Sequence, residues 1–472
     1  MATITRSDYP AVFRRDTPTI GISSQFCLVP APDMTPDVQM PESYIDTYYR
    51  RTIVDHSAYR SLAGAHQVDV CVIGGGLAGL STAYECVQRG RKVALLEQHR
   101  IAWGASGRNG GFVTAGYATG HGQIVRRAGE TNAKALHDLS VEGVRILREN
   151  IDRLDLARVN PTPGVMRAIR YDDAAGLQAE VAEAKRRFGA TLRYLSREEV
   201  QEKLKSKAYF QGIYAPDAFH FHPLNYALGL GAAIAQRGGL IYEQTAATGI
   251  IRKPGGFTVA AEGGSIEAEH IVVCGGGYTG RVAPALQRAY LPIATYMLLT
   301  EPIANLAEAI DTPAAIADDR RAGDYYRVVD GNRILWGGCI TTRTADPANL
   351  AEIMRRRIVE TYPQLKDLRV AAAWSGLMSY ARHLMPQIGR TADGLWYATG
   401  FGGHGMNTTA IAGRVVAEAI VGESDRIRLY APFGLDWNGG PFGRIAVQAT
   451  YWYLQAMDVW RERGAHQTDA RP

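Results

Sequence analysis

The sequence predicts an α/β protein in two parts, a Rossmann-like domain and an inserted α+β domain built on a large mixed or antiparallel sheet. Three observations predict this fold class. A strand, a glycine turn, a helix and a second strand follow one another in Val68–Glu97. The chain of 472 residues is longer than one hydrophobic core usually organises. Long β-type segments with few helices fill Tyr290–Leu377, which is typical of a sheet-based second domain.

The first of these units has every part of a dinucleotide-binding turn. Gly74, Gly76 and Gly79 form a G-x-G-x-x-G pattern. The first glycine permits a tight turn, the second lets backbone N–H groups approach a pyrophosphate, and the third allows close packing of helix and strand. The helix N-terminus favours the phosphate charge, and Glu97 can accept a hydrogen bond from a ribose hydroxyl. A close-packed turn without a ligand is the simpler alternative. The expected strand, helix and second strand are Val68–Ile73, Leu77–Arg89 and Lys92–Leu96.

Composition excludes several function classes. The chain has 46% hydrophobic and 21% charged residues and a net charge of +5, without a long basic run, so no nucleic-acid partner is expected. The five cysteines show no C-x-x-C or metal-ligand spacing, which indicates free thiols in a reducing compartment and no metal site. No signal peptide or transmembrane helix is expected, and a cytoplasmic location is the default.

A second glycine-rich stretch follows Glu97. Gly104–Gly111 has the sequence GASGRNGG, in which small residues let the backbone lie against a flat ligand. Ser106 can donate to a phosphate, while Arg108 or Asn109 can meet the electron-rich edge of a ring. A plain glycine-rich turn is the alternative interpretation, but the position directly after the first unit favours a ligand-binding loop.

With these two stretches the chain resembles the D-amino acid oxidase-type (DAO) flavoproteins, most closely the branch that contains γ-glutamylputrescine, glycine and sarcosine oxidases. The resemblance implies that the dinucleotide is FAD, held by the first unit at its ADP half. It also implies that the SGRNGG loop lies along the isoalloxazine ring. A γ-glutamylputrescine-like amine is the favoured substrate.

The next segment, Ala118–Pro216, contains alternating helices and short strands without a chemical motif. Helices are expected at Gln123–Leu154, Ala174–Phe188 and Glu198–Leu204, and this segment forms the first half of the inserted domain. The two histidines that follow, His220 and His222, lack a third ligand nearby, so a strand leading into a capped helix is the better interpretation than a metal site.

The chain then returns to the first domain. A helix at Leu224–Ala235 precedes a strand at Leu240–Ile251, whose backbone, near Ala247, the resemblance places at the adenine. A second literal G-x-G-x-x-G begins at Gly275. It would imply an NAD(P) site, but Pro284 interrupts the would-be crossover helix. We therefore expect a strand that turns beside the first phosphate site.

The strands of the inserted domain are expected to carry specificity residues on their flavin-facing side. Tyr290–Thr300 is one long strand, and Asp330-Gly331 predicts a tight turn between two further strands, Asp324–Val329 and Asn332–Gly338. A helix at Ala351–Tyr362 and a strand at Leu368–Leu377 follow. Aromatic residues in such strands often belong to the core. The candidates are Tyr296, Tyr326, Trp336, Tyr380 and His383.

The last motif lies in Leu395–Ile420, which predicts a strand, a glycine loop and a helix. Gly400–Gly405 matches the G-[FY]-x-G-H-G pattern of the resembled family. The N-terminal end of a helix carries positive partial charge, so it can stabilise an anionic reduced flavin. His404 is interpreted as a structural residue of this loop or as one that adjusts the flavin environment.

Two departures from relatives bear on the chemistry. Relatives with covalent FAD carry a cysteine before this glycine loop or a histidine in the SGRNGG position. This chain has Ser375–Leu377 and Arg108 there, and Cys339 lies too far upstream, so we expect non-covalent FAD. Some relatives activate oxygen with a lysine, but Tyr290–Asn305 contains none. An oxidase is expected over a dehydrogenase, with O₂ or another electron acceptor.

The predicted domains are discontinuous. Residues 1–66 form an N-terminal arm with a short helix at Glu42–Tyr49. Residues 67–118, 218–280 and 385–430 form the FAD-binding domain, and residues 119–217 and 281–384 form the substrate domain. Residues 431–472 form a C-terminal loop and a helix at Ile445–Arg463, which is expected to pack on the body. A role at a membrane surface is the alternative for this aromatic-rich helix. The oligomeric state is unknown.

The resemblance implies a reaction in which a neutral amine passes a hydride to flavin N5, and the resulting imine hydrolyses to an aldehyde or keto acid. Alternatives are an amino acid or N-methyl amino acid oxidase or dehydrogenase, or a flavin-binding protein without turnover. Predicted catalytic residues are Arg108, Asn109, Tyr296 and His404. Predicted cofactor-binding residues are Gly74, Gly76, Leu77, Ala78, Gly79, Glu97, Gln98, Ser106, Arg108, Asn109, Gly110, Ala247, Gly275, Gly402, Gly403, His404, Gly405, Met406 and Asn407.

Overall fold

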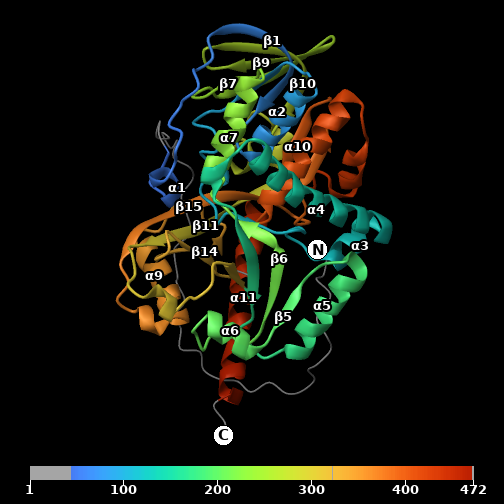
Figure 1. Ribbon diagram of the computed structural model, residues 1–472. Helices are drawn as coiled ribbons and strands as arrows, with labels where there is room; N and C mark the ends of the chain where they lie inside the picture. The colour runs from blue at the N-terminus through green and yellow to red at the C-terminus, as the bar shows by residue number, and fades with distance from the viewer. Residues whose placement is uncertain (1–43, 321–322, 470–472) are drawn as a thin grey trace.

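Two sheets organise the molecule in the computed structural model, which describes residues 44–320 and 323–469 (Figure 1). The first sheet has eight strands in the order β16-β17-β10-β1-β2-β7, with β9 beside β10 and β8 beside β9. The neighbours of β1 on both sides, β10 and β2, run parallel to it. The strands are β1 (Gly64–Ile73), β2 (Val93–Leu96), β7 (Leu240–Tyr242), β8 (Ala247–Lys253), β9 (Gly256–Ala261), β10 (Gly264–Val273), β16 (Gln387–Arg390) and β17 (Trp396–Thr399).

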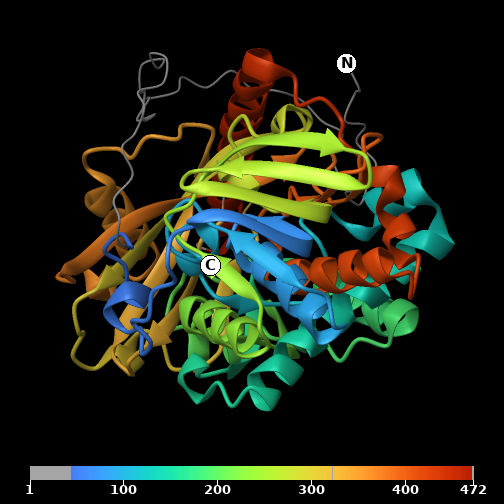
Figure 2. The ribbon, with the colours of Figure 1, turned by 90° about the horizontal axis from the view of Figure 1, so that it is seen from above.

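Three helices pack together beside this sheet. They are α2 (Leu77–Gln88), α7 (Pro223–Gln236) and α10 (Gly405–Val421), with α2 in contact with both of the others. A β-carbon on Gly413 of α10 would lie 2.5 Å from the backbone of Ser81, so the lack of a side chain there lets α10 and α2 approach closely. Seen from above, the yellow-green strands β8–β10 lie to one side of the blue β1 (Figure 2).

The second sheet has nine strands in the order β15-β11-β14-β13-β12-β4-β6-β3, with β5 beside β6. β12 and β4 run parallel and the other pairs are antiparallel, so this sheet is mixed. The two sheets confirm the predicted α/β fold class with a large mixed second sheet. The strands are β3 (Phe112–Val113), β4 (Thr162–Ala168), β5 (Arg193–Leu195), β6 (Gly212–His220), β11 (Tyr290–Thr300), β12 (Ala315–Asp318), β13 (Tyr325–Val329), β14 (Arg333–Thr341) and β15 (Val370–Ala381).

The remaining helices cover the second sheet and connect it to the first. α9 packs on one face of the second sheet and closes a separate hydrophobic core there. These helices are α1 (Tyr48–Arg51), α3 (His121–Ala128), α4 (Glu130–Arg153), α5 (Ala174–Phe188), α6 (Arg197–Lys203), α8 (Pro284–Gln287), α9 (Leu350–Thr361) and α11 (Gly440–Asp469). Short 3₁₀ segments occur at Ala105–Gly107, Ala157–Val159, Gly276–Tyr278, Leu306–Glu308, Pro363–Leu365 and Arg426–Phe433.

Three predicted elements were wrong in extent. The helix expected at Gln123–Leu154 is two helices, because Gly129 adopts φ +80° between α3 and α4. The strand expected at Leu240–Ile251 is split into β7 and β8, which pair with β2 and β9 respectively. The helix expected at Glu42–Tyr49 is the shorter α1, and its first two expected residues lie outside the described part of the chain.

Other predictions are confirmed. The hairpin between β13 and β14 turns at Asp330 and Gly331, both with positive φ. Cys71, Cys86 and Cys274 are free and buried, and burial raises the pKa of each thiol to about 12. In the described ranges, no helix is long and apolar enough to cross a membrane.

Candidate active site

The first glycine turn is packed so closely that side chains are excluded from it. Gly74, after β1, adopts φ +106°, and a β-carbon there would lie 2.9 Å from the carbonyl carbon of Cys274, at the end of β10. A β-carbon on Gly79, in the first turn of α2, would lie only 1.9 Å from the carbonyl oxygen of Gly74. The turn therefore presents bare backbone at the helix N-terminus, which is the arrangement that a phosphate group needs.

The second glycine-rich loop lies directly on this helix N-terminus. The Leu77 N–H, at the start of α2, donates to the Ser106 hydroxyl oxygen at 3.0 Å. A β-carbon on Gly76 would lie 3.0 Å from the same oxygen. Because the hydroxyl oxygen accepts from the helix, its own hydrogen is left as a donor, and its donation to a phosphate stays a prediction.

Glu97 closes the other side of the turn at the end of β2. Its Oε2 accepts from the Gly75 N–H at 2.7 Å and its Oε1 from the His99 N–H at 2.9 Å. Burial raises the pKa of the Glu97 carboxyl to about 7, although these N–H groups oppose the shift. The Thr245 N–H donates to the Glu97 carbonyl at 2.9 Å, so the segment leading to Ala247 lies beside this acid, and Gln98 next to it is exposed.

Asn109 shapes the second loop with its side chain. Its Nδ2 donates to the carbonyls of Ala105 and Ser106 at 3.0 Å, and its Oδ1 accepts from the Gly111 N–H at 2.7 Å. The Tyr49 hydroxyl, from α1, donates to the Asn109 carbonyl at 2.5 Å. Asn109 thus has a clear structural role, and α1 of the N-terminal arm secures the same loop.

Arg108 is buried in the same loop, with 7% of its surface exposed. Its Nε donates to the Trp103 carbonyl at 3.0 Å and its Nη1 to the Ser375 carbonyl of β15 at 3.3 Å. The guanidinium carbon lies 4.3 Å from the centre of the Trp103 ring. Burial lowers the pKa of Arg108. Within the described residues it has no ion pair with a carboxylate, and its Nε and Nη1 donate to backbone carbonyls, so it can act on a ligand through its positive charge and not as a hydrogen-bonding clamp.

The third loop joins β17 to α10. His404 lies at the N-cap of α10, and its Nε2 lies 2.9 Å from the Thr114 hydroxyl. Burial lowers the pKa of His404, so the ring is neutral at pH 7. The Asn407 side chain donates to the carbonyls of Ser140 and Gly116 at 3.1 and 3.3 Å and fixes α10 against α4. The first backbone N–H groups of α10, from Gly405 onward, have no acceptor inside the helix and leave a positive end.

The second sheet meets these loops through two tyrosines. A β-carbon on Gly110, in the second loop, would lie 2.9 Å from the Tyr325 ring. A β-carbon on Gly403, in the third loop, would lie 2.8 Å from the Tyr380 hydroxyl. Burial raises the pKa of the Tyr325 hydroxyl to about 12. The second and third loops therefore meet neutral tyrosines of the second sheet, while the second loop also contacts the first glycine turn.

Comparison with known proteins agrees with this geometry. The sequence model of the family described as DAO, FAD dependent oxidoreductase, matches residues 69–419. The chain belongs to the DAO family of FAD-dependent oxidoreductases. Its members bind FAD, and bare backbone at Gly74 and Gly79, the Ser106 hydroxyl and the Glu97 carboxylate fit the ADP half of that cofactor.

Several relatives cover most of the chain. Gamma-glutamylputrescine oxidoreductase of Escherichia coli is 31% identical over 391 residues, which are 82% of this chain and 92% of that protein. Probable oxidoreductase OrdL of Haemophilus influenzae is 28% identical over 432 residues, 89% of this chain and 99% of that one. The crystal structure of glycine oxidase from Geobacillus kaustophilus superposes with a TM-score of 0.67 at 21% identity, covering 79% and 99% of the two chains.

Not all predicted site residues lie at the DAO loops. Tyr296 belongs to the core that α9 closes, whereas the neighbouring Thr295 bonds to the Gly338 carbonyl and lies 3.4 Å from the Tyr325 hydroxyl. Tyr326 and Trp336 stack in the same core as Tyr296, with ring centres 4.1 Å apart. Among the five aromatic candidates, the loops are contacted by Tyr380.

His383 is a further candidate that lies away from the loops. Its Nε2 lies 3.1 Å from the Gly434 carbonyl, and its ring packs on Phe433, so it holds the segment before α11.

Three residues at the loops were missed by the sequence reasoning. Tyr325 directly precedes the candidate Tyr326, so strand alternation was the available signal, but it does not show which face is which. Tyr49 lies in the arm and gives no motif. Arg327 donates to the Tyr49 hydroxyl at 3.1 Å and to the Phe221 carbonyl at 3.0 Å beneath Gly111.

The second glycine motif has no crossover helix. After Gly275 the chain forms a 3₁₀ turn at Gly276–Tyr278 and then only the four-residue α8. The Gly275 Cα lies 3.0 Å from the position of a β-carbon on Gly74. As predicted, Gly275 belongs to a turn beside the first glycine motif, next to Gly74.

The two adjacent histidines have structural roles. His222 is the N-cap of α7, where its Nδ1 accepts from the Asn225 N–H at 3.0 Å, as the capped-helix interpretation predicted. His220 lies 2.8 Å from the Pro313 carbonyl and 3.0 Å from Arg327. Burial lowers the pKa of each histidine to about 3. The described residues contain no cluster that could hold a metal ion.

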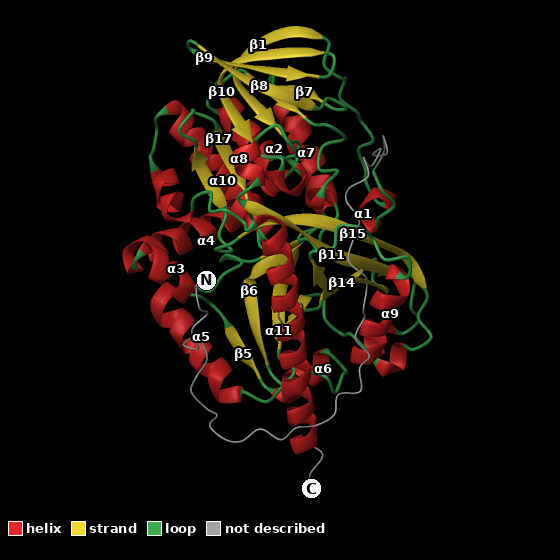
Figure 3. Cartoon of the chain, turned by 180° about the vertical axis from the view of Figure 1, so that it is seen from behind, coloured by secondary structure: helices red, strands yellow, loops and turns green. Residues whose placement is uncertain are grey.

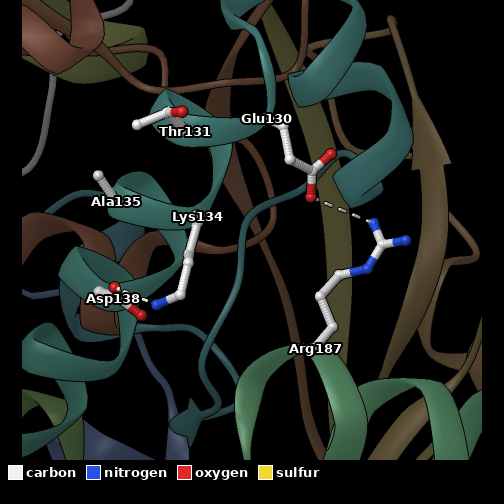
Figure 4. Close-up of a pocket in the computed structure, with 6 residues that line it drawn as sticks. All are labelled: Glu130, Thr131, Lys134, Ala135, Asp138 and Arg187. Carbon is white, nitrogen blue, oxygen red and sulfur yellow. Dashed lines mark hydrogen bonds and ion pairs between the residues drawn. The ribbon is translucent and has the colours of Figure 1, made fainter.

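A surface pocket of about 340 Å³ lies elsewhere, where the start of α4 faces the end of α5 (Figure 4). Glu130 pairs with Arg187 at 3.8 Å, and Lys134 pairs with Asp138 at 3.0 Å. Since its charged side chains are exposed and paired with one another, this pocket has no role in the site.

Proposed function

We propose that the protein oxidises the C–N bond of an amine of the γ-glutamylputrescine type and releases an aldehyde after hydrolysis of the imine. The similarity to gamma-glutamylputrescine oxidoreductase carries this proposal, because it extends over 82% of this chain and 92% of that protein. When bound, FAD supplies the hydride acceptor for such a reaction. The protein supplies position and electrostatics.

The proposed roles follow from the three loops. The turn at Gly74–Gly79, with Ser106 and Glu97, binds the pyrophosphate and ribose. The buried Arg108 and the N-terminal end of α10 place positive charge where negative charge develops, which stabilises the transition state electrostatically. This proposal also includes the remaining predicted cofactor-binding residues, the domain boundaries, the non-covalent attachment of FAD and the cytoplasmic location.

The two buried arginines of this region favour an amine over an α-amino acid. An amino acid oxidase needs a cation for the substrate carboxylate. Arg108 and Arg327 both donate to backbone carbonyls of the protein instead. An amino acid such as glycine is the second candidate, because glycine oxidase of Geobacillus kaustophilus is 24% identical over 391 residues.

Anaerobic reduction of the FAD-loaded protein tests the proposal. The yellow absorbance should bleach on addition of γ-glutamylputrescine, faster than with putrescine, glycine, sarcosine or proline at equal concentration. Faster bleaching by an amino acid would favour the second candidate, an amino acid substrate, over the proposed amine. If none of these compounds bleaches the flavin, the protein binds FAD but does not oxidise amines.

Oxygen is the proposed electron acceptor. All eight lysines lie among the described residues, and none of them is buried. We therefore assign the positive charge that assists oxygen reduction to Arg108. Stopped-flow mixing of the reduced protein with oxygen tests this: Arg108→Met should reoxidise at least tenfold more slowly than wild type, about 1.4 kcal/mol in barrier. Negligible reoxidation of the wild type would identify a dehydrogenase.

A further inference from the structure

The C-terminal helix α11 lies on the second sheet with its polar residues turned inward. Gln448 accepts from the Thr341 hydroxyl and from the Thr342 N–H, both at 3.0 Å. Arg444 donates to the Thr342 carbonyl at 2.9 Å. Near the other end, Glu462 lies 3.6 Å from Arg320. Figure 3 shows α11 running along the outside of the molecule in front of β5 and β6.

The outward face of α11 is apolar, which inverts the usual arrangement of a surface helix. Phe442 is 79% exposed, Ile445 68%, Trp452 54%, Tyr453 64% and Trp460 63%. Alanines, Met457 and Val459 fill most of the exposed positions between them, and Thr450 and Gln455 are the exposed polar residues in this stretch. The first exposed charged residue is Arg463. We call the residues Phe442, Ile445, Ala446, Ala449, Trp452, Tyr453, Ala456, Met457, Val459 and Trp460 the outer face of α11.

The spacing of the outer face is that of a helix that packs on another helix. One seven-residue repeat relates Phe442, Ala449 and Ala456. A second seven-residue repeat, shifted by three positions along the chain, relates Ile445, Trp452 and Val459. These are the a and d positions of three consecutive heptads. A helix that simply lies on its own domain directs such a seam inward, whereas here it points to solvent.

The exposed area approaches what a stable dimer needs. An aromatic side chain buries roughly 150–250 Å², so the four aromatic residues of the outer face expose on the order of 500 Å². With Ile445, Met457 and Val459 the face nears the ~800 Å² per partner of a standard interface. Exposed apolar patches of this size are uncommon on monomers.

The charges of α11 do not suit a lipid surface. A helix that lies on a membrane carries free Lys and Arg beside its apolar face. α11 has no lysine, and Arg444 is bound to the Thr342 carbonyl. Arg461 lies over the Tyr171 ring at 4.8 Å, in the segment between β4 and α5. The basic side chains of the helix are thus mostly directed toward the protein.

We propose that the outer face of α11 binds the same face of a second copy of the chain, with the two helices antiparallel. In an antiparallel pair each a position faces a d position of the partner. One register then pairs all six positions: Phe442 with Val459, Ile445 with Ala456, and Ala449 with Trp452. Two of these layers join a large side chain to an alanine, which lets the layers interdigitate. The contact is two-fold symmetric and closes as a dimer.

Sedimentation of the full-length, FAD-loaded protein tests the dimer. The wild type should sediment at twice the chain mass of 51.4 kDa in the micromolar range. Ile445→Glu combined with Trp452→Glu should weaken the dimer roughly 100-fold and yield monomers. Ile251→Glu is the matched control, because Ile251 is 59% exposed on β8, away from α11. The flavin absorbance of each variant reports that it is folded.

A charge pair tests the orientation. Ile445→Lys or Ala456→Glu alone should give monomers, whereas the double variant should dimerise again, because the introduced lysine of each copy then faces the introduced glutamate of the other. A wild type that stays monomeric overturns the proposal, and so does dissociation by Ile251→Glu as readily as by the α11 variant. Loss of dimers in the double variant overturns the antiparallel register. A monomer that cosediments with phosphatidylglycerol vesicles would instead assign the face to lipid.

Discussion

At the scale of single residues, the carboxyl of Glu97 combines a predicted cofactor role with a raised pKa. Burial raises its pKa to about 7 in the protein without FAD. A ribose hydroxyl that donates to this group favours the ionised form, so FAD binding lowers the pKa. Below pH 7 a proton must therefore leave when FAD binds, and FAD affinity falls as the pH decreases.

The expected size of this effect is about tenfold in the Kd for FAD between pH 8 and pH 6, with weaker binding at pH 6. Glu97→Gln should bind FAD weakly at both pH values, without this dependence. Titration of the apoprotein with FAD, followed by fluorescence, measures both. Glu267→Gln, at an exposed acid that pairs with Lys253, should retain the wild-type slope. The same slope in Glu97→Gln would assign the proton to another group.

Two adjacent tyrosines of β13 are expected to differ in their roles, Tyr325 in catalysis and Tyr326 in stability. Tyr325 faces the Gly110 loop, whereas the Tyr326 hydroxyl lies 2.6 Å from that of Tyr362 and 3.1 Å from that of Tyr209 in the core. Tyr325→Phe should slow anaerobic flavin reduction about two- to tenfold, the value of one hydrogen bond, and leave the melting temperature unchanged. Tyr326→Phe should do the reverse, lowering the free energy of unfolding by about 1 kcal/mol. If both variants reduce the flavin at the same rate, Tyr325 does not contribute to the site.

At the scale of elements, the turn between β1 and α2 depends on a contact that a single methyl group breaks. A β-carbon on Gly79 would overlap the Gly74 carbonyl oxygen at 1.9 Å, so Gly79→Ala must move α2 away from β1. We expect this variant to be purified without FAD and to unfold at a lower temperature. Gly249→Ala is the control, because nothing lies within 4 Å of a β-carbon there. Full FAD content in Gly79→Ala would contradict the predicted cradle.

Elements with local signals could be predicted from the sequence, and those that depend on distant contacts could not. The glycine turn at Gly74, the hairpin turn at Asp330-Gly331 and the cap of α7 each follow from residues a few positions apart. The break at Gly129 was missed, because an isolated glycine is also tolerated inside helices. The break between β7 and β8 has its cause in pairing with two different strands, β2 and β9.

The same limit applies to the candidate site. The three glycine loops could be predicted because each has its own motif. The side chains that the second sheet presents to them could not, since successive strand residues point to opposite faces and the pattern of β11 is apolar on both. The sequence favours Tyr296 and Tyr326, whereas their neighbours Thr295 and Tyr325 lie on the face that meets the loops.

At the scale of the whole molecule, a buried network of charges joins distant parts of the chain. Asp324, at the start of β13, accepts from Arg357 of α9 at 2.7 Å and pairs with Arg320. Asp318, at the end of β12, pairs with Arg320 at 2.6 Å and with Arg170 at 2.9 Å. Glu462 brings α11 to the same arginines. The network therefore fixes the second sheet, α9 and α11 relative to one another.

Removal of one buried charge of this network should lower the stability of the whole fold. Burial by itself raises the pKa of Asp324, but Arg357 and Arg320 outweigh it, so the pKa is lowered. A lowered pKa means that the carboxylate stabilises the fold above its unfolded pKa of about 3.9 and that this stability is lost as the pH falls through the folded pKa. Asp324→Asn should lower the free energy of unfolding at pH 7 by about 3 kcal/mol, because the half-buried Arg320 and Arg357 lose a buried carboxylate partner.

The control for this variant is Asp311→Asn. Asp311 forms an exposed pair with Lys205 at 3.7 Å, and exposed pairs contribute less than about 1 kcal/mol. Denaturant titration at pH 7 and at about pH 2, below the lowered pKa of Asp324, measures both variants. The deficit of Asp324→Asn should shrink in acid, since the wild type loses the same carboxylate there. Because Glu462 joins the network, the variant should also loosen α11 and weaken the proposed dimer, whereas Asp311→Asn should not affect it. If both variants lose the same small free energy of unfolding, the carboxylate of Asp318 alone is sufficient to balance the charge of the arginines.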